Sequence, residues 1–299
     1  MDENEWLAER FEEHRPRLRA VAYRMLGSFA EADDALQDAW LRLARSGTDE
    51  VSNLGGWLTT IVARVCLNML RARNLRREEP LGVHVPDPLI RVAGDLQPED
   101  EALLADSVGL ALQVVLDTLA PDERLAFVLH DMFQLPFGEI APLVGRTPGA
   151  ARQLASRARR RVAGAAAAPG PDLSRQRETV AAFFAAARHG DFDALVAVLH
   201  PEVVLRIDTG ALRPAGSMEL HGAEAVARQS LTGLAPVLRS VDLLPALVNG
   251  AAGVIATRRG RPVTVMAFAI RGGRIAAIDA IADPGRVRRI TAGILPPAG

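Results

Sequence analysis

The chain has 299 residues, of which 49% are hydrophobic, and its formal net charge at pH 7 is -1. This composition excludes an intrinsically disordered protein and is sufficient for two or three domains with packed cores. Because the chain as a whole is nearly neutral, any binding of nucleic acid must depend on local basic patches.

The number of cysteines and the N-terminal residues indicate the cellular compartment in which the protein is expected. The one cysteine, Cys66, excludes an internal disulfide framework and a multi-cysteine zinc site. The first residues, MDENEWLAERFEEHR, are too acidic for a signal peptide, and no apolar run is long enough to span a bilayer. We therefore expect a protein of the reducing cytoplasm with no membrane partner, no metal site and no cofactor.

Two helices are predicted at the N-terminal end. The first covers residues 5–26 and ends at Gly27. Ser28 and Glu31 have the spacing of a capping box, in which the hydroxyl and the carboxylate each accept a backbone N–H at a helix start. The second helix then runs to about Ala44.

The second helix carries an acidic face. Asp34 and Asp38 recur with Glu31 at helical spacing, and Gln37 lies beside them. Such a face suits a basic helix on another protein, but it is also typical of an ordinary solvated surface.

A longer helix is predicted from Leu54 to about Arg77. Arg64 and Asn68 recur on its outer face, and Trp57 stands near its start. A positive strip beside an aromatic side chain suits the backbone of an opened DNA strand, although Trp57 equally fits a packed core. The strip also contains Thr60, Arg71, Arg73, Arg76 and Arg77.

Four prolines interrupt residues 78–101, and we interpret this segment as a linker without regular structure. A helix from Asp106 to Leu119 is predicted next. After a turn at PDER, a further helix covers Arg124 to Phe133.

Residues 134–162 have the pattern of a helix-turn-helix motif. Apolar residues recur at helical spacing from Phe137 to Val144, and Pro142 among them predicts a short or kinked helix because proline removes a backbone donor. Gly145 ends this helix, and Thr147 with Pro148 starts the next one.

The second helix of this motif has an apolar side and a polar side. Side chains on the polar side can bind phosphates or base edges in a major groove. A helix whose arginines only keep it soluble has the same composition, so the preceding half of the motif is what favours DNA binding. The polar side consists of Arg152, Gln153, Ser156, Arg157, Arg159 and Arg160.

The composition changes after the break AAAAPGPDLS at residues 165–174. One helix containing Phe183 and Phe184 is followed by strand-like runs, and the sequence Arg-Gly-Gly-Arg at residues 271–274 predicts a tight hairpin. This part is therefore α+β. Its predicted strands are Val203–Ile207, Val254–Thr257, Val263–Ile270 and Ile275–Ile281.

Three segments resemble one family. EADDALQDAWLRL, NLGGWLTTIVARVCLNMLRAR and LDTLAPDERLAFVLHDMFQLPFGEIAPLVGRTPGAARQLASRARRRV resemble regions two and four of the bacterial extracytoplasmic function (ECF) sigma factors, in the sigma-70 family. The resemblance covers about residues 11–162. It implies two all-α modules, a region 2 helical bundle and a region 4 helix-turn-helix, that bind core RNA polymerase and promoter DNA.

The resemblance also implies a polymerase-binding surface. The β′ clamp helices are the expected partner of the acidic face, and the β flap is a second expected contact on the polymerase. The residues assigned to the clamp helices are Asp34, Gln37 and Asp38.

Contacts to both promoter elements follow from the same resemblance. Asn53 and Leu54 match the loop that captures a flipped base of the melted minus-ten element, with Trp57, Arg64 and Asn68 in support. The residues expected at the minus-thirty-five element are Thr147, Arg152, Gln153, Ser156 and Arg157.

The tail is similar to a SnoaL-like domain of the NTF2-like superfamily, a cone of curved sheet covered by helices. RETVAAFFAAARHGDFDALVAVLHPEVVLRID and RPVTVMAFAIRGGRIAAIDAIADP carry this resemblance, which identifies the chain as a member of the subgroup ECF41. The linker signature WLPEP appears as HVPDP at residues 84–88, and the tail signature DGGGK as DTGAL at residues 208–212. The subgroup implies regulation in cis through contact of Pro86, Asp87 and Pro88 with Asp208, Thr209 and Gly210.

The resulting organisation is multidomain. The expected parts are region 2 at 1–79, a linker at 80–100, region 4 at 101–164, a second linker at 165–173 and the SnoaL-like domain at 174–299.

Other functions stay open at this stage. SnoaL-like folds include enzymes that use an aspartate or histidine in an apolar cone, and His200, Asp208, His221 and Asp279 are available, although no spacing among them demands catalysis. We expect no catalytic residues. An unknown small-molecule ligand in the cone and a repressor that binds DNA without polymerase are the remaining alternatives.

Overall fold

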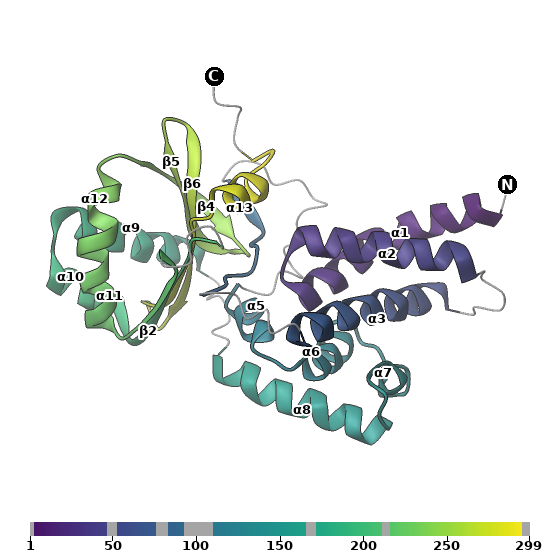
Figure 1. The fold of residues 1–299 in the computed structure, drawn as a ribbon. Coiled ribbons are helices and arrows are strands. Elements are labelled where there is room, and N and C mark those ends of the chain that lie inside the picture. Colours follow the sequence, from purple (N-terminus) through teal and green to yellow (C-terminus); the bar gives the residue numbers. More distant parts are fainter. Residues whose placement is uncertain are drawn as a thin grey trace. The chain divides into compact units, whose positions relative to one another are not determined.

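The computed structural model describes residues 3–46, 53–75, 83–92, 110–165, 172–210 and 216–294. The chain forms two compact units, shown in Figure 1. A helical unit comprises Met1–Glu79 and Gln113–Ala165, and an α+β unit comprises Pro80–Leu112 and Ala166–Gly299. The segment expected to be a linker therefore belongs to the same unit as the C-terminal domain.

Three long helices form the first part of the helical unit. These are α1 (Glu3–Leu26), α2 (Phe29–Ser46) and α3 (Leu54–Leu75). Their apolar stripes meet in a common core, because Leu18, Leu36 and Leu58 are each at most 1% exposed. None of the described helices is long and apolar enough to cross a membrane.

The expected capping box at the start of α2 is only half formed. The backbone N–H of Glu31 donates to the Ser28 hydroxyl at 3.5 Å, as predicted. The Glu31 carboxylate does not turn back to the helix start, because it instead accepts from the Arg73 guanidinium on α3. A tertiary ion pair thus replaces the local hydrogen bond that the sequence predicted.

The second part of the helical unit comprises α5 (Leu110–Asp117), α6 (Pro121–Phe127), a π-helical segment (Val128–Met132), α7 (Phe137–Val144) and α8 (Pro148–Ala165). The prediction that a helix begins at Arg124 was wrong, because Pro121 occupies the first position of α6, where its missing N–H costs nothing. The expected helix start at Asp106 lies outside the described residues.

The helix-turn-helix has the expected form. Pro142 lies inside α7, which is only eight residues long, and Gly145 follows with a left-handed φ of 66°. Ile140 on α7 and Ala151 on α8 are fully buried, so the two helices pack through their apolar sides.

The second part of the helical unit packs onto the first. Gln113 on α5 donates through Nε2 to the Tyr23 and Arg24 carbonyls, at 3.4 and 3.3 Å, and Arg124 on α6 donates through Nε to the Arg24 carbonyl at 3.0 Å. These carbonyls lie in the last turn of α1, where a helix carries a partial negative charge. The Arg124 guanidinium also pairs with Asp117, so a buried cation caps a helix of the other module.

The α+β unit is built on a seven-stranded sheet with the order β1-β4-β5-β6-β7-β2-β3. The strands β2 and β7 are parallel, and all other neighbours are antiparallel. The strands are β1 (Ile90–Val92), β2 (Leu199–Asp208), β3 (Met218–His221), β4 (Asp242–Val248), β5 (Ala251–Arg258), β6 (Arg261–Arg271) and β7 (Arg274–Ile281).

Helices cover one face of this sheet, and a short helix packs on the other, as Figure 1 shows. The covering helices are α9 (Leu173–His189), α10 (Phe192–Val198), α11 (Ala223–Gln229) and α12 (Ala235–Leu238), with a π-helical segment at Ser230–Leu234, and α13 (Pro284–Ile290) packs beside β6. Between the helices and the sheet lies an apolar core containing Phe183, Phe184 and Phe268. A curved sheet with helices on one face agrees with the α+β expectation.

The sequence missed three strands of this sheet. β4 contains Pro245, a residue that argues against a strand interior, and β3 has only four residues. The segment expected to lack regular structure contains β1, because Leu89 and the residues after it pair with the β4 edge although prolines precede them. The predicted hairpin at Gly272 and Gly273 is present, with positive φ at both glycines.

Candidate functional site

The acidic face of α2 is accessible. Asp34, Gln37 and Asp38 are exposed, whereas Ala35 and Ala39 are buried. The neighbouring carboxylates are engaged inside the unit, since Asp33 pairs with Arg19 and Glu31 with Arg73. No ion pair within the described part of the chain involves Asp34 or Asp38, which leaves both available to a partner.

Leu41 extends this acidic face, and the sequence reasoning missed it. Its side chain is 47% exposed, three residues after Asp38 and four after Gln37, which is the spacing of neighbours on one helix face. Among the described residues, Leu41 and Val237 are the large hydrophobic side chains with such exposure. The face therefore combines two carboxylates with an apolar contact.

The expected minus-ten residues lie along α3. Asn53 caps the helix, since its Oδ1 accepts the Gly56 N–H at 3.0 Å, and Leu54 begins it half-buried. Arg64 and Asn68 are both exposed, one turn apart, and Trp57 is half-buried. Trp57 is thus partly packed and partly accessible.

Other arginines of the expected positive strip have internal partners. Arg71 pairs with Asp122 of α6 at 2.8 Å, and Arg73 pairs with Glu31. Arg76 and Arg77 lie outside the described residues. The accessible part of the strip is consequently centred on Arg64 and Asn68.

The polar side of α8 divides into two sets of side chains. Arg159 pairs with Asp131 at 2.6 Å and Arg161 with Glu123 at 3.2 Å, so these two arginines hold α8 on the unit. The expected reading set is also accessible: Thr147, Arg152, Gln153 and Arg157 are exposed and Ser156 is half-buried. Arg157 Nη1 lies 3.8 Å from Oε1 of the same Glu123, so Arg152 is the arginine of the set with no ion pair among the described residues.

Two members of the reading set are oriented by local contacts. Thr147 accepts the Ala150 N–H at 3.3 Å and so caps α8, as expected. The Arg152 guanidinium lies 5.5 Å from the centroid of the Phe137 ring, a cation–π contact that orients it on the accessible side.

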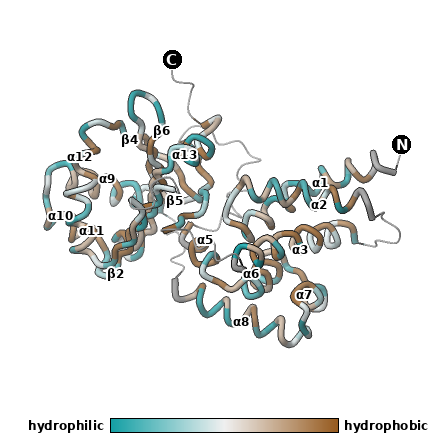
Figure 2. Tube along the Cα trace, in the orientation of Figure 1, coloured by the Kyte–Doolittle hydropathy of each residue, from teal (hydrophilic) through white to brown (hydrophobic). Residues whose placement is uncertain are grey.

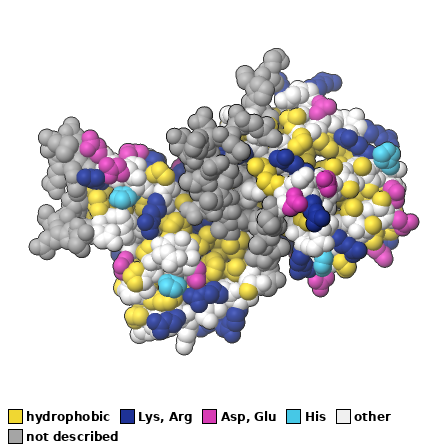
Figure 3. All heavy atoms as spheres, turned by 180° about the vertical axis from the view of Figure 1, so that it is seen from behind, with side chains coloured by type: hydrophobic (Ala, Val, Ile, Leu, Met, Phe, Trp, Pro, Cys, Tyr) yellow, Lys and Arg dark blue, Asp and Glu magenta, His cyan; other side chains and the backbone are white. Residues whose placement is uncertain are grey.

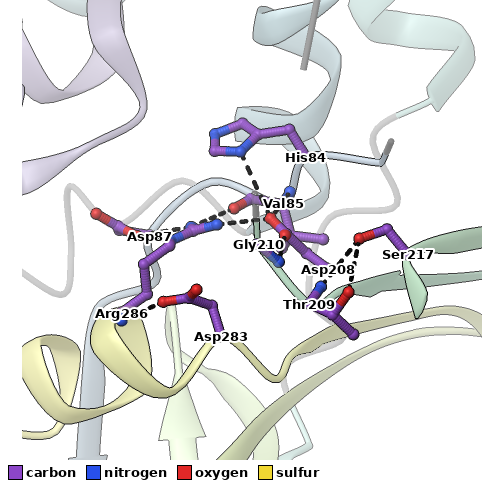
Figure 4. A network of polar contacts seen from close by, with 9 residues as sticks. All are labelled: His84, Val85, Asp87, Asp208, Thr209, Gly210, Ser217, Asp283 and Arg286. Carbon is purple, nitrogen blue, oxygen red and sulfur yellow. Dashed lines mark hydrogen bonds and ion pairs between the residues drawn. The ribbon is translucent and has the colours of Figure 1, made fainter. Parts of the chain in front are cut away.

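The structure brings the two expected regulatory motifs together in the α+β unit. Figure 4 shows Asp208 at the end of β2 beside the segment that contains His84, Val85 and Asp87. One oxygen of Asp208 accepts the Val85 N–H at 2.9 Å and lies 3.5 Å from His84 Nδ1. The other accepts the Gly210 N–H at 2.9 Å.

Arg286 on α13 joins the two motifs, and no local sequence signal identified it. Its Nη1 donates to Asp208 at 2.6 Å, its Nη2 donates to Asp87 at 2.6 Å, and its Nε donates to Asp87 at 2.9 Å. The Arg286 side chain is 14% exposed, and the two carboxylates are 2% and 4% exposed. These three side chains form what we call the linker clamp.

The environment of Asp208 favours its charged form. Burial raises the pKa of this carboxyl, but hydrogen bonds from His84 and the Val85 N–H, together with the charge of Arg286, bring the pKa well below its ordinary value. Asp208 is therefore an acceptor for the linker and not a proton donor near neutral pH.

A second contact holds the linker at Leu89, two residues after Asp87. Asn249 lies in the turn between β4 and β5, where its Oδ1 accepts the Leu89 N–H at 2.6 Å and its own N–H donates to the Leu89 carbonyl at 2.7 Å. Beyond this point Ile90–Val92 pairs with β4 as an edge strand. Asn249 and Gly250 form a dipeptide that is typical of tight turns, but the contact of Asn249 with Leu89 is not visible from the local sequence.

The remaining expected regulatory residues support the clamp. Pro86 and Pro88 are buried on either side of Asp87. Thr209 donates its N–H to the Ser217 hydroxyl at 3.1 Å, which shapes the turn after β2. Gly210 has a φ of 76°, and a Cβ there would lie 2.1 Å from an Asp283 oxygen, so the position requires glycine.

The four residues considered for catalysis do not converge. His200 contacts Arg271, and His221 contacts Glu219 at 2.8 Å, both on the surface. Asp208 belongs to the linker clamp. Asp279 pairs with Arg206 at 3.2 Å, and burial raises its pKa although Arg206 opposes the shift.

The interior of the cone is apolar. Its core cluster consists of hydrophobic side chains, and Phe183, Phe184 and Phe268 contact one another edge-on. Within the described ranges there is no group of three or more histidine, cysteine or acidic side chains that could hold a metal ion.

Comparisons with known proteins agree with this arrangement. Residues 10–76 match the model for sigma-70 region 2, and residues 109–162 match that for sigma-70 region 4. The ECF RNA polymerase sigma factor SigJ of Mycobacterium tuberculosis is 37% identical over 288 residues, which cover 92% of this chain and 91% of SigJ. The chain belongs to the ECF sigma factors.

Further similarity extends over both units of this ECF sigma factor. The probable sigma factor SigI of M. tuberculosis is 31% identical, covering 95% of this chain and 96% of SigI. The crystal structure of M. tuberculosis SigJ aligns with a TM-score of 0.70 and 33% identity, covering 93% of this chain and 97% of that one. Sigma factors initiate transcription with core RNA polymerase on promoter DNA, and they are not enzymes.

Proposed function

We propose that the C-terminal domain of this ECF sigma factor regulates initiation in cis by holding the linker between regions 2 and 4. The observation that carries the proposal is the linker clamp, in which buried Arg286 joins Asp87 of the linker to Asp208 of the domain. The strand β1 then adds the linker to the sheet edge.

The spacing of the two promoter elements explains how holding the linker would affect initiation. The minus-ten and minus-thirty-five elements lie about 25 base pairs apart, which is about 85 Å of duplex at 3.4 Å per base pair. In the helical unit, however, Arg71 of α3 and Arg157 of α8 line the same surface pocket. Regions 2 and 4 must therefore separate on the promoter, and the connection between them must follow.

The clamp makes this connection a two-state element. When the linker is bound to the domain, ten residues of the connection, 83–92, lie along its surface. When the linker is released, the same residues can extend by about 3.3–3.6 Å each between the two modules. Polymerase and promoter shift the balance only by the difference in their affinities for the two states.

Within the helical unit, we assign roles by accessibility. Asp34, Gln37 and Asp38, with Leu41, bind the β′ clamp helices in this proposal, and the β flap binds region 4. The exposed part of α3 contacts the minus-ten strand, and the reading set of α8 contacts the minus-thirty-five element. These contacts take place in the cytoplasm, where polymerase and promoter meet.

A shortened chain tests regulation in cis. A chain that ends after Asp283 lacks Arg286 and should give a higher yield of run-off transcript with core polymerase than the full chain, because the linker is no longer held. The control is a chain that ends after Ile294, which keeps α13. A yield equal to or below that of the full chain would contradict the proposal.

A substitution in α8 tests the reading set. Arg152→Ala should weaken holoenzyme binding to the preferred upstream element by about 1–3 kcal/mol and relax its sequence preference, because arginine discriminates bases through their edges. The measurement is the fluorescence anisotropy of labelled duplexes that carry either the preferred element or random sequence. An equal loss on both duplexes would instead assign Arg152 to a phosphate contact.

A further inference from the structure

The sheet contains three tight hairpins with the same turn geometry, and one of them has an unexpected sequence. Both central residues have positive φ in each turn: 49° and 76° at Asn249 and Gly250, 58° and 76° at Gly272 and Gly273, and 51° and 72° at Arg259 and Gly260. Turns of this kind strongly favour Asn-Gly and Gly-Gly. The first two hairpins follow this preference, and the third places an arginine in the left-handed region.

An arginine in this conformation weakens the turn. Its Cβ crowds the backbone in a way that asparagine tolerates better and glycine avoids. Residues held in sparsely populated backbone conformations concentrate at functional sites, where the surrounding structure maintains them. The hairpin between β5 and β6 therefore retains a side chain that its own turn disfavours.

The arginine belongs to a cluster at one end of the sheet. Arg258 and Arg261 face each other across the hairpin, and Arg259 lies between them at the tip. Arg258 Nη2 donates to the Ser240 hydroxyl at 3.2 Å, which places Arg239 beside the hairpin. We call Arg239, Arg258, Arg259 and Arg261 the hairpin cluster.

The hairpin cluster is exposed and uncompensated within the described part of the chain. All of its members are exposed, and no ion pair of the described residues involves any of them. Arg206, Arg228 and Arg271 of the same unit each pair with a carboxylate. Other exposed arginines such as Arg188 and Arg274 have no ion pair among the described residues either, but the hairpin cluster brings four such side chains to one end of the sheet. The nearest acid by register is Asp242, which lies opposite Thr257.

The figures agree with this charge distribution. The loop that joins β5 and β6 is among the most hydrophilic parts of the α+β unit in Figure 2. Dark blue side chains lie along the upper edge of the same unit in Figure 3.

A solubilising role does not explain this arrangement. Like charges directly across a hairpin destabilise it, so Arg258 opposite Arg261 lowers the stability of a turn that Arg259 already weakens. Mixed charges would give solubility without that cost. The arrangement is instead suited to an anionic partner that offsets the repulsion.

We propose that the hairpin cluster binds the phosphate backbone of duplex promoter DNA, as a third contact that carries no sequence information. Arginine guanidinium groups donate to phosphate oxygens in charge-assisted and often bidentate hydrogen bonds. A protein surface is a poorer fit, because protein interfaces combine arginine with aromatic or large apolar anchors. Residues 258–261 at the tip carry none, and the exposed hydrophobic side chain near Arg239 is a single valine, Val237. The proposal goes beyond linker regulation and rests only on membership in the ECF sigma factors.

One substitution separates a binding role from a structural role. Arg259→Asn gives the turn a residue that it favours, so the melting temperature of the full chain should stay equal or rise. The same variant should weaken holoenzyme binding to a duplex from which it transcribes by about threefold at low salt, because one phosphate contact is lost. If Arg259 had only a structural role, the substitution would change the melting temperature and the affinity for the duplex in the same direction.

The full test removes three charges at once. Arg258→Gln, Arg259→Asn and Arg261→Gln together should weaken binding about tenfold or more, and the slope of log affinity against log salt should become less steep by about 2 to 3. The control carries Arg188→Gln, Arg228→Gln and Arg274→Gln, which remove the same charge from exposed sites elsewhere in the unit.

The outcomes are distinct. A loss confined to the hairpin variant, and equal on promoter and random duplexes, supports a backbone contact because phosphates carry no sequence information. Equal affinities and salt slopes for the hairpin variant and its control would overturn the proposal. Weaker binding of single-stranded RNA with unchanged duplex binding would also overturn it.

Discussion

Replacing Arg286 by methionine should release the linker from the C-terminal domain. The substitution keeps a similar length but removes the guanidinium that the buried carboxylates of Asp87 and Asp208 share. Removing one partner of a buried ion pair costs about 3–5 kcal/mol, since the remaining charge is no longer compensated. The bound state of the linker should lose stability by about this amount.

Hydrogen exchange measures this release directly. Amides of residues 83–92 should exchange faster in Arg286→Met, whereas those of β5, β6 and β7 should keep their protection because the sheet does not depend on β1. Arg289→Met is the matched control, since Arg289 lies on the same helix and is exposed.

Two results would contradict the interpretation. Unchanged protection of residues 83–92 would show that β1 and Asn249 hold the linker without Arg286. General loss of protection across the sheet would show that Arg286 stabilises the domain as a whole and not the linker contact.

Replacing Arg124 by methionine should destabilise the helical unit. The Arg124 side chain is 3% exposed, pairs with Asp117 and donates to the Arg24 carbonyl at the end of α1. Its loss leaves Asp117 and the end of α1 without their cation. We expect the free energy of unfolding of this unit to fall by about 3 kcal/mol, at the lower end of the range because Asp117 keeps partial access to water.

Chemical denaturation followed by circular dichroism checks this value, because the helical unit contributes most of the helix signal. Arg160→Met on α8 is the control, since Arg160 is exposed and its substitution should change stability by less than about 0.5 kcal/mol. Equal stabilities of the two variants would show that Arg124 does not join region 4 to region 2.

The two variants act on different restraints. Arg286→Met frees the connection between the modules, and Arg124→Met weakens the contact of the modules themselves. Because these residues lie in separate units, their effects on stability should add.

Local patterns in the sequence determined much of the helical unit. Apolar spacing from Phe137 to Val144, the break at Gly145 and the Thr147 cap are properties of a few consecutive residues, and all are present in the structure. The hairpin at Gly272 and Gly273 was predictable for the same reason, because backbone conformation there depends on the absence of Cβ.

Only the tertiary structure decided which charged side chains were available. The sequence placed Arg152 and Arg159 on the same polar side of α8, but Asp131 pairs with Arg159 and leaves Arg152 accessible. Likewise, the local capping pattern assigned Glu31 to its own helix, and Arg73 on another helix binds it instead.

The linker clamp shows the same limit of local sequence patterns, between residues that lie farther apart in the chain. The sequence identified Asp87 and Asp208 through family motifs, yet Arg286, which joins them, lies 199 residues after Asp87. Its burial depends on how β2, α13 and the linker fold together. Local patterns determine which elements form because backbone preferences act over a few residues, whereas ion pairs and added strands depend on chain segments that only folding brings together.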